Sequence, residues 1–253
     1  IRLTTLGELM LIVSFHLEKY GKIKRYLDAV LARCPHITSL FYCINPKLND
    51  YVGDLEMILH AGKPFIEEQL GHVRFKIGPK SFFQTNSRQA KNLYDQVVEF
   101  AGLTGQENVY DLYTGVGSIA LYVAKFCRHV VGIEEVPEAI VDAEENARRN
   151  DTTNCTFYAG DVKNILTPAF AEQHGKPDLL ITDPPRAGMH ENVNKMLLEL
   201  ASPKIVYVSC NPATQARDLL ILSEKYDLEK IRPVDMFPHT HHVETVALLK
   251  LKA

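Results

Sequence analysis

The sequence predicts an α/β fold built on a doubly wound, mostly parallel sheet, and three observations support this prediction. From about Gly105 to the end of the chain, short apolar strands alternate with helical segments. A turn with two glycines, Gly115 and Gly117, follows the first of these strands. The last two strands follow one another without a helix, so an antiparallel pair is expected to close one edge of the sheet.

The sequence pattern over residues 1–75 predicts a smaller α+β subdomain. Its helix is expected near residues 22–33 and ends before Pro35, because proline cannot continue a helix. Its strands are expected near residues 8–16, 38–44, 55–60 and 72–77.

The larger predicted domain, residues 76–253, begins with a helix over Ser87–Phe100. Its parallel strands are expected near residues 107–113, 129–134, 155–159, 178–183 and 204–209. The helices between them are expected at roughly residues 117–126, 137–149, 162–173, 190–201 and 213–225. Pro137 suits the start of the second of these helices, because its fixed φ fits the first helical position. The final antiparallel strands are expected near residues 228–236 and 243–251.

The composition is that of an ordinary globular protein. At 253 residues and 46% hydrophobic, the chain can bury a full core. Its formal net charge of −3 gives no global basic signature, so any contact with nucleic acid must come from a local patch. The five cysteines form no CxxC pair and no metal-binding spacing, which indicates reduced thiols in a cytoplasmic protein. The apolar stretch Leu9–Phe15 is too short to cross a bilayer, so no membrane association is expected.

The glycine turn of the larger domain is typical of a nucleotide-binding site. Gly115 and Gly117 let the backbone approach a ligand closely, and the helix that starts at Ser118 offers unpaired N–H groups. The next strand ends at Glu134, whose carboxylate could accept hydrogen bonds from ribose hydroxyls. The spacing Gly115-x-Gly117-x-x-Ala120 also fits a dinucleotide fingerprint, so an NAD-dependent enzyme is an alternative.

Two acidic positions favour a different ligand. Asp111 stands four residues before the first glycine, where an anion suits a cationic or amine-bearing ligand better than a pyrophosphate. Asp183-Pro184-Pro185-Arg186 ends the fourth strand, where an open α/β sheet places its ligand. These features suit S-adenosylmethionine and a nucleobase substrate. Taken alone, the second motif is equally compatible with a plain turn that ends a strand, because proline cannot continue a ladder.

A thiol lies just after one predicted strand, and a carboxylate lies at the start of the last one. Cys210, in Ser209-Cys210-Asn211-Pro212, ends an apolar strand, and Glu244 lies 34 residues further on. A single cysteine is more often an inert buried side chain than a nucleophile. With a carboxylate to move a proton, however, a thiolate can form and release a covalent intermediate.

The run His239-Thr240-His241-His242 is a weak candidate for a metal site. It has no cysteine or acid at ligand spacing, and it adjoins Glu244. No metal ligand is therefore predicted.

Five motifs occur in a fixed order over nearly the whole chain. They are Ser81-Phe82-Phe83-Gln84-Thr85-Asn86, Asp111-Leu112-Tyr113-x-Gly115-x-Gly117, Asp183-Pro184-Pro185-Arg186-Ala187-Gly188, Tyr207-Val208-Ser209-Cys210-Asn211-Pro212 and His242-Val243-Glu244-Thr245. In this order they resemble the RNA uracil-C5 methyltransferase family. The resemblance implies a Rossmann-like, class I S-adenosylmethionine-dependent methyltransferase fold and an enzyme that makes 5-methyluridine in ribosomal or transfer RNA. The segment Met236-Phe237-Pro238-His239 is more similar to the ribosomal-RNA branch, so 23S rRNA is the favoured substrate.

The resemblance also implies roles for individual residues. Cys210 is expected to be the nucleophile and Glu244 the base. The positions expected to bind S-adenosylmethionine include the acids and glycines of the nucleotide turn. They are Gln84, Asp111, Tyr113, Gly115, Gly117, Ser118, Glu134, Asp161 and Asp183.

The chemistry explains why these residue types are needed. Uracil C5 is a poor carbon nucleophile, and a thiolate added to C6 pushes electron density toward it. In this hypothesis Cys210 attacks C6, the enolate takes the methyl group at C5, and Glu244 removes the C5 proton so that elimination frees the enzyme.

The uracil must leave its stack to reach the thiol. Arg186 and Asn211 are candidates to hydrogen-bond the pyrimidine edge. Phe82 and Phe83 are candidates to stack on the base, and are equally compatible with a role as core aromatics. The subdomain of residues 1–75 is the expected additional contact with RNA.

The chain departs from the family in three respects. Members commonly carry an N-terminal β-barrel RNA-binding domain, and ribosomal-RNA members often have a four-cysteine iron–sulfur cluster, and this chain shows neither. We therefore expect a piece of a longer protein, with no metal or iron–sulfur cluster in this piece and no obligate protein partner. Thr114 stands where many relatives have cysteine, which does not threaten the chemistry.

Three alternatives to the ribosomal-RNA enzyme remain open. The first is a transfer-RNA uracil-C5 methyltransferase. The second is an amino-methyltransferase for adenine or cytosine, which has a similar proline loop but usually an aromatic residue at the position of Arg186, and no need of Cys210. The third is a non-catalytic RNA-binding module that keeps the fold.

Overall fold

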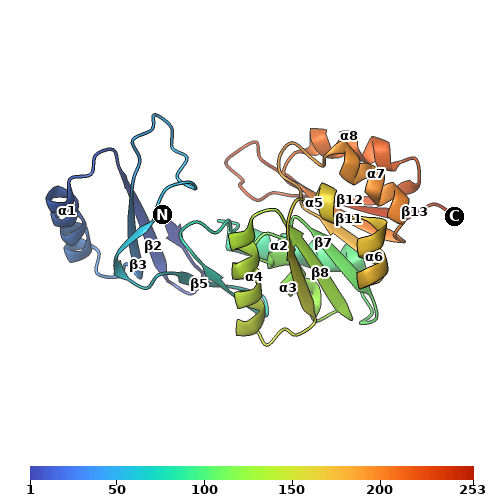
Figure 1. The fold of residues 1–253 in the computed structure, drawn as a ribbon, viewed down its shortest axis with the longest axis horizontal. Helices are drawn as coiled ribbons and strands as arrows, with labels where there is room; N and C mark the ends of the chain where they lie inside the picture. Colours follow the sequence, from blue (N-terminus) through green and yellow to red (C-terminus); the bar gives the residue numbers. More distant parts are fainter. The chain divides into compact units, whose positions relative to one another are not determined.

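The structure is a computed structural model that describes all residues from Ile1 to Ala253. The chain divides into two compact units, whose elements are labelled in Figure 1. The first unit comprises Ile1–Gln69 and Arg74–Ser87, and the second comprises Leu70–Val73 and Arg88–Ala253. The units therefore interleave along the sequence, whereas the sequence predicted a single boundary at residue 75.

A four-stranded sheet with one helix forms the body of the first unit. The strand order is β1-β2-β3-β4, with bounds Arg2–Leu3, Leu9–Phe15, Ser39–Ile44 and Ile58–Gly62. Strands β2 and β3 are parallel, and α1 (Tyr20–Arg33) makes the crossover that parallel neighbours need. The helix packs on this sheet (Figure 1) through one buried cluster, made of Ile23, Leu27, Leu40 and Tyr42.

The hairpin of β5 (Ile66–Leu70) and β6 (Val73–Ile77) explains why the units interleave. Its tip, Leu70–Val73, belongs to the second unit, where the ring of His72 lies 5.0 Å from that of Tyr122. A boundary at residue 75 would cut through β6. The sequence pattern did not predict β5 or the short β1.

A seven-stranded sheet organises the second unit, in the order β12-β13-β11-β10-β7-β8-β9. Strands β7 to β11 are mutually parallel where they pair, and β13 is antiparallel to both of its neighbours. The strands run over Asn108–Leu112 (β7), His129–Glu134 (β8), Cys155–Ala159 (β9), Leu179–Thr182 (β10), Lys204–Ser209 (β11), Tyr226–Val234 (β12) and Glu244–Leu251 (β13). The predicted doubly wound sheet with an antiparallel last pair is thus confirmed.

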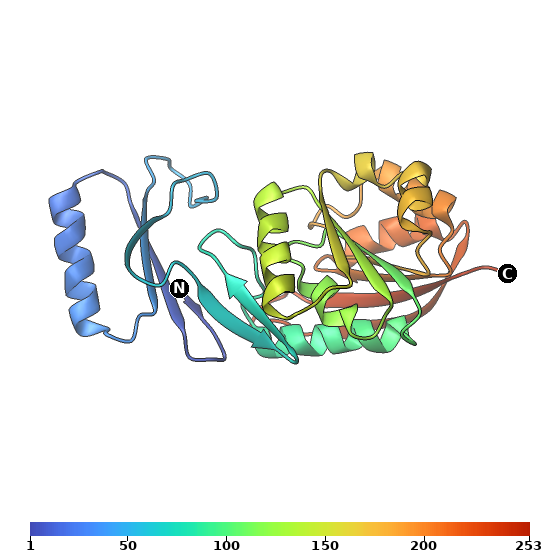
Figure 2. The same cartoon turned by 60° about the horizontal axis from the view of Figure 1, so that its bottom comes forward.

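Helices cover both faces of this sheet. Figure 2 shows α2 on one side, and α7 and α8 on the other. The helices run over Ser87–Ala101 (α2), Ser118–Ala124 (α3), Pro137–Arg149 (α4), Val162–Ile165 (α5), Pro168–His174 (α6), Glu191–Leu200 (α7) and Pro212–Leu222 (α8). Every helix of the chain is too short or too polar to serve as a membrane span.

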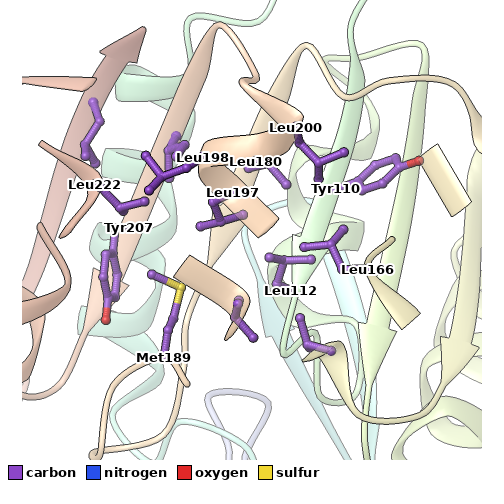
Figure 3. Packing of buried hydrophobic residues seen from close by; sticks show 14 of the residues in the cluster. Tyr110, Leu112, Leu166, Leu180, Met189, Leu197, Leu198, Leu200, Tyr207 and Leu222 are labelled. Atoms are coloured by element: carbon purple, nitrogen blue, oxygen red, sulfur yellow. The ribbon is translucent and has the colours of Figure 1, made fainter. Parts of the chain in front are cut away.

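The core beneath α5 to α8 follows the alternation of the strands. On β7, Tyr110 and Leu112 face this core, and Asp111 between them faces the opposite side. Leu180 and Tyr207 continue the layer on β10 and β11 (Figure 3). The helices contribute a set of buried aliphatic side chains, which includes Leu166, Val193, Leu197, Leu198, Leu200 and Leu222.

One predicted helix, over residues 162–173, is two helices in the structure. Pro168 occupies the first turn of α6, and the residue before a proline is disfavoured in the helical region. Thr167 accordingly has extended backbone, with φ −124° and ψ 160°, and its hydroxyl accepts a hydrogen bond from the N–H of Phe170 at 3.1 Å. The proline and the threonine cap thus end one helix and begin the next.

We expect Leu197→Ala to lower the free energy of unfolding of the second unit by about 2–5 kcal/mol, because it leaves a cavity in a close-packed core. Leu197 is 0% exposed on α7, whereas Leu220 on α8 is 76% exposed. Leu220→Ala is therefore the matched control, with an expected loss of less than about 0.5 kcal/mol. Urea unfolding followed by circular dichroism measures both, and equal losses would contradict the assignment of Leu197 to the core.

Candidate active site

The strand order of the larger sheet reverses between β7 and β10. Leu112 pairs with Thr182, so the chain leaves the sheet at Tyr113 and at Asp183 on neighbouring strands. Open α/β sheets bind ligands in the crevice outside such a reversal. The motifs predicted as ligand-binding from the sequence therefore leave the sheet at the position where this fold binds its ligands.

The turn after β7 is shaped by the buried carboxylate of Asp111, which is 1% exposed. Its Oδ2 accepts hydrogen bonds from Thr114 Oγ1 at 2.5 Å and from the Ala120 N–H at 3.1 Å. Burial, with the nearby charge of Glu134, raises the pKa of Asp111 to about 7, although its two hydrogen bonds oppose this rise. Asp111 thus joins the turn to α3, and its predicted contact with a cofactor stays a prediction.

Left-handed backbone at three positions allows the turn to fold back over the strand end. Gly115 and Gly117 have φ values of 57° and 76°, and Tyr113 adopts φ 64°. This conformation costs glycine little but costs a non-glycine residue about 1–2 kcal/mol, so Tyr113 is held in a strained conformation. Burial raises the pKa of its phenol, which therefore stays protonated near neutral pH.

The carboxylate of Glu134 faces this turn from the end of β8. One oxygen accepts the N–H of Gly115 at 3.0 Å, and the other accepts the N–H of Val136 at 3.0 Å. An ionised carboxylate has about four lone-pair positions, so this one keeps acceptor capacity for hydroxyl groups. This placement suits the predicted contact with a ribose.

Two other predicted cofactor residues already have partners within the protein. The Ser118 hydroxyl accepts a hydrogen bond from the Tyr94 O–H at 2.9 Å. Asp161 caps α5 by accepting the N–H of Lys163 at 3.0 Å, and it forms a 2.6 Å ion pair with the ammonium of Lys163. These hydrogen bonds lower the pKa of Asp161.

The register of β11 with β13 brings Cys210 and Glu244 together. Ser209 lies opposite Thr245, so the residue after β11 and the first residue of β13 are neighbours. Gln215 fixes this register by accepting the Thr245 hydroxyl at 2.7 Å and donating to the Tyr207 carbonyl at 2.9 Å. Two residues that are 34 positions apart in sequence therefore share one end of the sheet.

Burial and charge set the protonation of this pair. Burial raises the pKa of Glu244, which is 9% exposed, and Arg186 opposes the rise. Burial also raises the pKa of the Cys210 thiol, as do the charges of Glu244 and Asp183, while a hydrogen bond and the charge from Arg186 lower it. A carboxylate with a raised pKa suits general base catalysis near neutral pH.

Asp183 adds a further carboxylate beside this pair. Burial raises its pKa well above the usual value, and the charges of Glu244 and Asp111 add to this effect. A cationic ligand would relieve the repulsion among these carboxyl groups. The arrangement therefore fits a nucleoside that has both a positive charge and ribose hydroxyls.

The loop that follows Asp183 is fastened by Asp218, a fully buried residue of α8. Its carboxylate accepts the Met189 N–H at 2.8 Å and the Tyr207 O–H at 2.7 Å, and it pairs with Arg217 at 2.8 Å. Arg217 in turn donates to the carbonyl of Ala187 at 2.9 Å. The sequence does not predict this pair, because nothing in the segment around Asp218 shows which loop it contacts.

Arg186 and Asn211, the predicted contacts for a pyrimidine edge, meet each other. Asn211 donates its amide N–H to the carbonyl of Arg186 at 3.1 Å, and its Oδ1 accepts the N–H of Ala213 at 3.1 Å. The amide of Asn211 thus caps α8 and holds the arginine loop. The guanidinium of Arg186 lies against His242, with 2.6 Å between Nη2 and Nδ1.

Three predicted residues belong to the first unit. Phe82 is 77% exposed, whereas the ring of Phe83 lies 5.2 Å from that of Phe75. Gln84 is half-buried in the segment between β6 and α2. Their predicted roles with substrate and cofactor stay predictions. No group of three or more His, Cys, Asp or Glu side chains in the chain could hold a metal ion.

Comparison with solved structures identifies the class of fold. The chain superposes on the structure of Pyrococcus abyssi tRNA (uracil-54, C5)-methyltransferase in complex with S-adenosyl-L-homocysteine with a TM-score of 0.79 and 35% identity, over 98% of this chain and 58% of that one. Trm5b from the same organism matches in fold, with a TM-score of 0.65 at 19% identity over 97% of this chain and 74% of that one. The chain has the class I S-adenosylmethionine-dependent methyltransferase fold, as predicted.

Sequence comparison finds RNA methyltransferases that are similar to this chain. Residues 173–252 match the family described as tRNA (Uracil-5-)-methyltransferase. Two proteins described as uncharacterized RNA methyltransferases are similar, one from Porphyromonas gingivalis at 58% identity over 98% of this chain and 54% of its own length, and one from Bacteroides thetaiotaomicron at 54% over 100% and 56%. The chain is thus similar to the tRNA (Uracil-5-)-methyltransferase family over residues 173–252 and to these RNA methyltransferases over nearly all of its own length, and it spans about half the length of these curated relatives.

We expect Gly188→Ala to loosen the arginine loop. Gly188 has φ 78°, and a Cβ there would lie 2.5 Å from Arg217 Nη2 and 2.7 Å from Asp218 Oδ2. The variant should lower the free energy of unfolding by about 2–5 kcal/mol, from the left-handed backbone and the overlap together. Gly105 has φ 96° with nothing within 4 Å, so Gly105→Ala should cost only about 1–2 kcal/mol. Equal losses in urea unfolding would show that the ion pair does not confine the loop.

Proposed function

We propose that this chain is the catalytic part of an enzyme that transfers a methyl group from S-adenosylmethionine to C5 of a uridine in RNA. The observation that supports this most directly is the register of β11 and β13, which sets the Cys210 thiol beside the Glu244 carboxylate. An amino-methyltransferase has no need of such a pair. We propose the cytoplasm, where thiols stay reduced, as the place of action.

In the proposed reaction the Cys210 thiolate forms a bond to uracil C6, and the electron pair of the C5–C6 double bond moves toward O4 as an enolate. S-adenosylmethionine, when bound, supplies the methyl group to C5. Glu244 then accepts the C5 proton, the electrons of that C–H bond restore the double bond, and the C6–S bond breaks to return the thiolate. Arg186, beside both groups, favours the ionised forms of each.

The residues around the turn fit S-adenosylmethionine in charge and shape. We propose that Glu134 accepts the ribose hydroxyls, and that the acidic cluster with Asp183 favours the cationic methyl donor. The other proposed contacts are Gln84, Tyr113, Gly115, Gly117, Ser118 and Asp161, while Asp111 shapes the turn.

We propose ribosomal RNA as the substrate, because the segment Met236-Phe237-Pro238-His239 resembles the ribosomal-RNA branch. Transfer RNA is the second candidate, since the Pyrococcus abyssi neighbour at 35% identity is a tRNA (uracil-54, C5)-methyltransferase. Residues 1–75, together with Phe82 and Phe83, are the proposed additional contacts with RNA, with the exposed ring of Phe82 available to stack on a base.

Wild-type protein should form a covalent complex with RNA that contains 5-fluorouridine when S-adenosylmethionine is present. Fluorine at C5 cannot leave as a proton, so the thioether to Cys210 is trapped and appears as a retarded band on a denaturing gel. Cys210→Ala should abolish the band, and Cys34→Ala, which alters another partly exposed cysteine, should retain it. Both ribosomal and transfer RNA are offered, and absence of a band with either RNA would count against a covalent uracil methyltransferase.

Glu244→Gln should accumulate the same complex on ordinary RNA, because the C5 proton can no longer be removed. General base catalysis typically contributes about 10²–10⁴-fold, so release should slow by that factor. The half-life of the band after a chase with unlabelled RNA measures this. Release at the wild-type rate would show that another group removes the proton.

Glu134→Gln should weaken the binding of S-adenosylhomocysteine by about 10- to 150-fold, because a hydrogen bond to a charged acceptor is worth about 1.5–3 kcal/mol. Titration calorimetry measures this without RNA. Glu138, an exposed acid in the first turn of α4, supplies the control variant Glu138→Gln, which should bind as wild type does. Equal affinities of both variants for S-adenosylhomocysteine would show that Glu134 does not bind the ribose.

A further inference from the structure

The side chain of Arg186 contacts His242 and the thiol of Cys210. Its backbone is fixed, because its carbonyl accepts hydrogen bonds from Asn211 Nδ2 at 3.1 Å and from Thr214 Oγ1 at 3.2 Å. The side chain is exposed, however, and a free arginine loses rotamer entropy when it is held in one place. Its guanidinium lies 2.6 Å from Nδ1 of His242.

The chemistry of this contact favours a neutral histidine. A guanidinium has only donors, so a ring nitrogen that accepts from it must be unprotonated. Arg186 Nη2 lies 2.6 Å from Nδ1 and 3.4 Å from Nε2 of His242, and the neutral imidazole offers one acceptor nitrogen in either tautomer. Burial lowers the pKa of His242, and the charges of Arg186 and His241 lower it further, which favours this neutral form.

Hydrogen bonds in the segment before β13 hold the backbone of His242 in place. The N–H of His242 donates to Thr240 Oγ1 at 3.1 Å, and the Thr240 hydroxyl donates to the carbonyl of Phe237 at 2.9 Å. Glu244 begins β13 two residues further on. The histidine is thus attached to the same strand end as the proposed base.

The location of the Arg186 guanidinium matters because Arg186 lowers the pKa of the Cys210 thiol, whereas several other groups raise it. Glu244 at the start of β13 and Asp183 after β10 both raise the pKa of the thiol, as does burial. Arg186 is the cation that lowers it, through a hydrogen bond and through its charge. A guanidinium that swung into solvent would raise the pKa of the thiol further, so that less thiolate would be present at a given pH.

We propose that His242 is a positioning residue that, as a neutral hydrogen-bond acceptor, holds the Arg186 guanidinium against the Cys210 thiol. The inference rests on the proposed function, in which Cys210 is the nucleophile. Protonation of the imidazole would replace the acceptor by a donor and place two cations together. The charged and titratable groups around the contact are Arg186, His241, Cys210, Glu244 and Asp183. Among them, His241 is the other histidine.

The rate at which iodoacetamide alkylates Cys210, measured against pH by mass spectrometry of its peptide, tests this proposal. In His242→Leu the midpoint of the profile should rise by about one pH unit, which makes alkylation at neutral pH about tenfold slower. His242→Asn, which keeps an acceptor but does not titrate, should stay within about threefold of wild type. His239→Leu, an exposed histidine of the same segment, is the matched control and should leave the profile unchanged.

A double variant separates positioning from a general structural effect. Arg186→Gln alone should raise the midpoint, and His242→Leu added to it should produce no further shift, because the two residues act through one contact. The alkylation rate of Cys34 in each variant reports whether the fold is intact. Wild-type behaviour of His242→Leu, or an additive shift in the double variant, would overturn the proposal.

The measurement is independent of methyl transfer, because alkylation needs neither RNA nor S-adenosylmethionine. A shifted profile in His242→Leu with no 5-fluorouridine complex in wild type would support the positioning contact and count against the proposed function. An unchanged profile together with the complex would support the proposed function and count against the positioning contact.

Discussion

The antiparallel pairing of β11 with β13 is the constraint on which the candidate active site depends. Ser209 opposite Thr245 sets Cys210 beside Glu244, and a slip of one residue would send the carboxylate to the other face of the sheet. Strand β13 is paired on both sides, so its register is fixed along its whole length. The hydrogen bonds of Gln215 reinforce that register at the end where the chemistry is proposed.

Charge is distributed unevenly around this strand end. Burial raises the pKa values of Asp183 and Glu244, and the charges of Glu244 and Asp111 raise the pKa of Asp183 further. Arg186 opposes this effect from an exposed loop, and the loop stays in place through a buried pair, Asp218 with Arg217. The electrostatics of the site therefore depend on contacts made beneath the loop, away from any substrate.

The sequence could predict what local pattern and family resemblance determine. The doubly wound sheet, its antiparallel last pair and the start of α4 at Pro137 follow from alternation and from proline geometry. Long-range pairing could not be predicted: nothing near Asp218 indicates that it holds the loop of Arg186, and nothing near residue 70 indicates that a hairpin tip belongs to the second unit. Asp111 and Asn211 were predicted as ligand contacts because of their motifs, and the structure shows that their side chains also fasten the loops that bear those motifs.

The interleaving of the two units limits how the chain can be divided. The polypeptide passes from one unit to the other between Gln69 and Leu70, between Val73 and Arg74, and again between Ser87 and Arg88. A fragment that starts at Arg88 would lose His72 and with it the aromatic contact to Tyr122. Gene fusion or exchange at a single junction would therefore separate residues that pack together, so the two units are expected to be inherited as one piece.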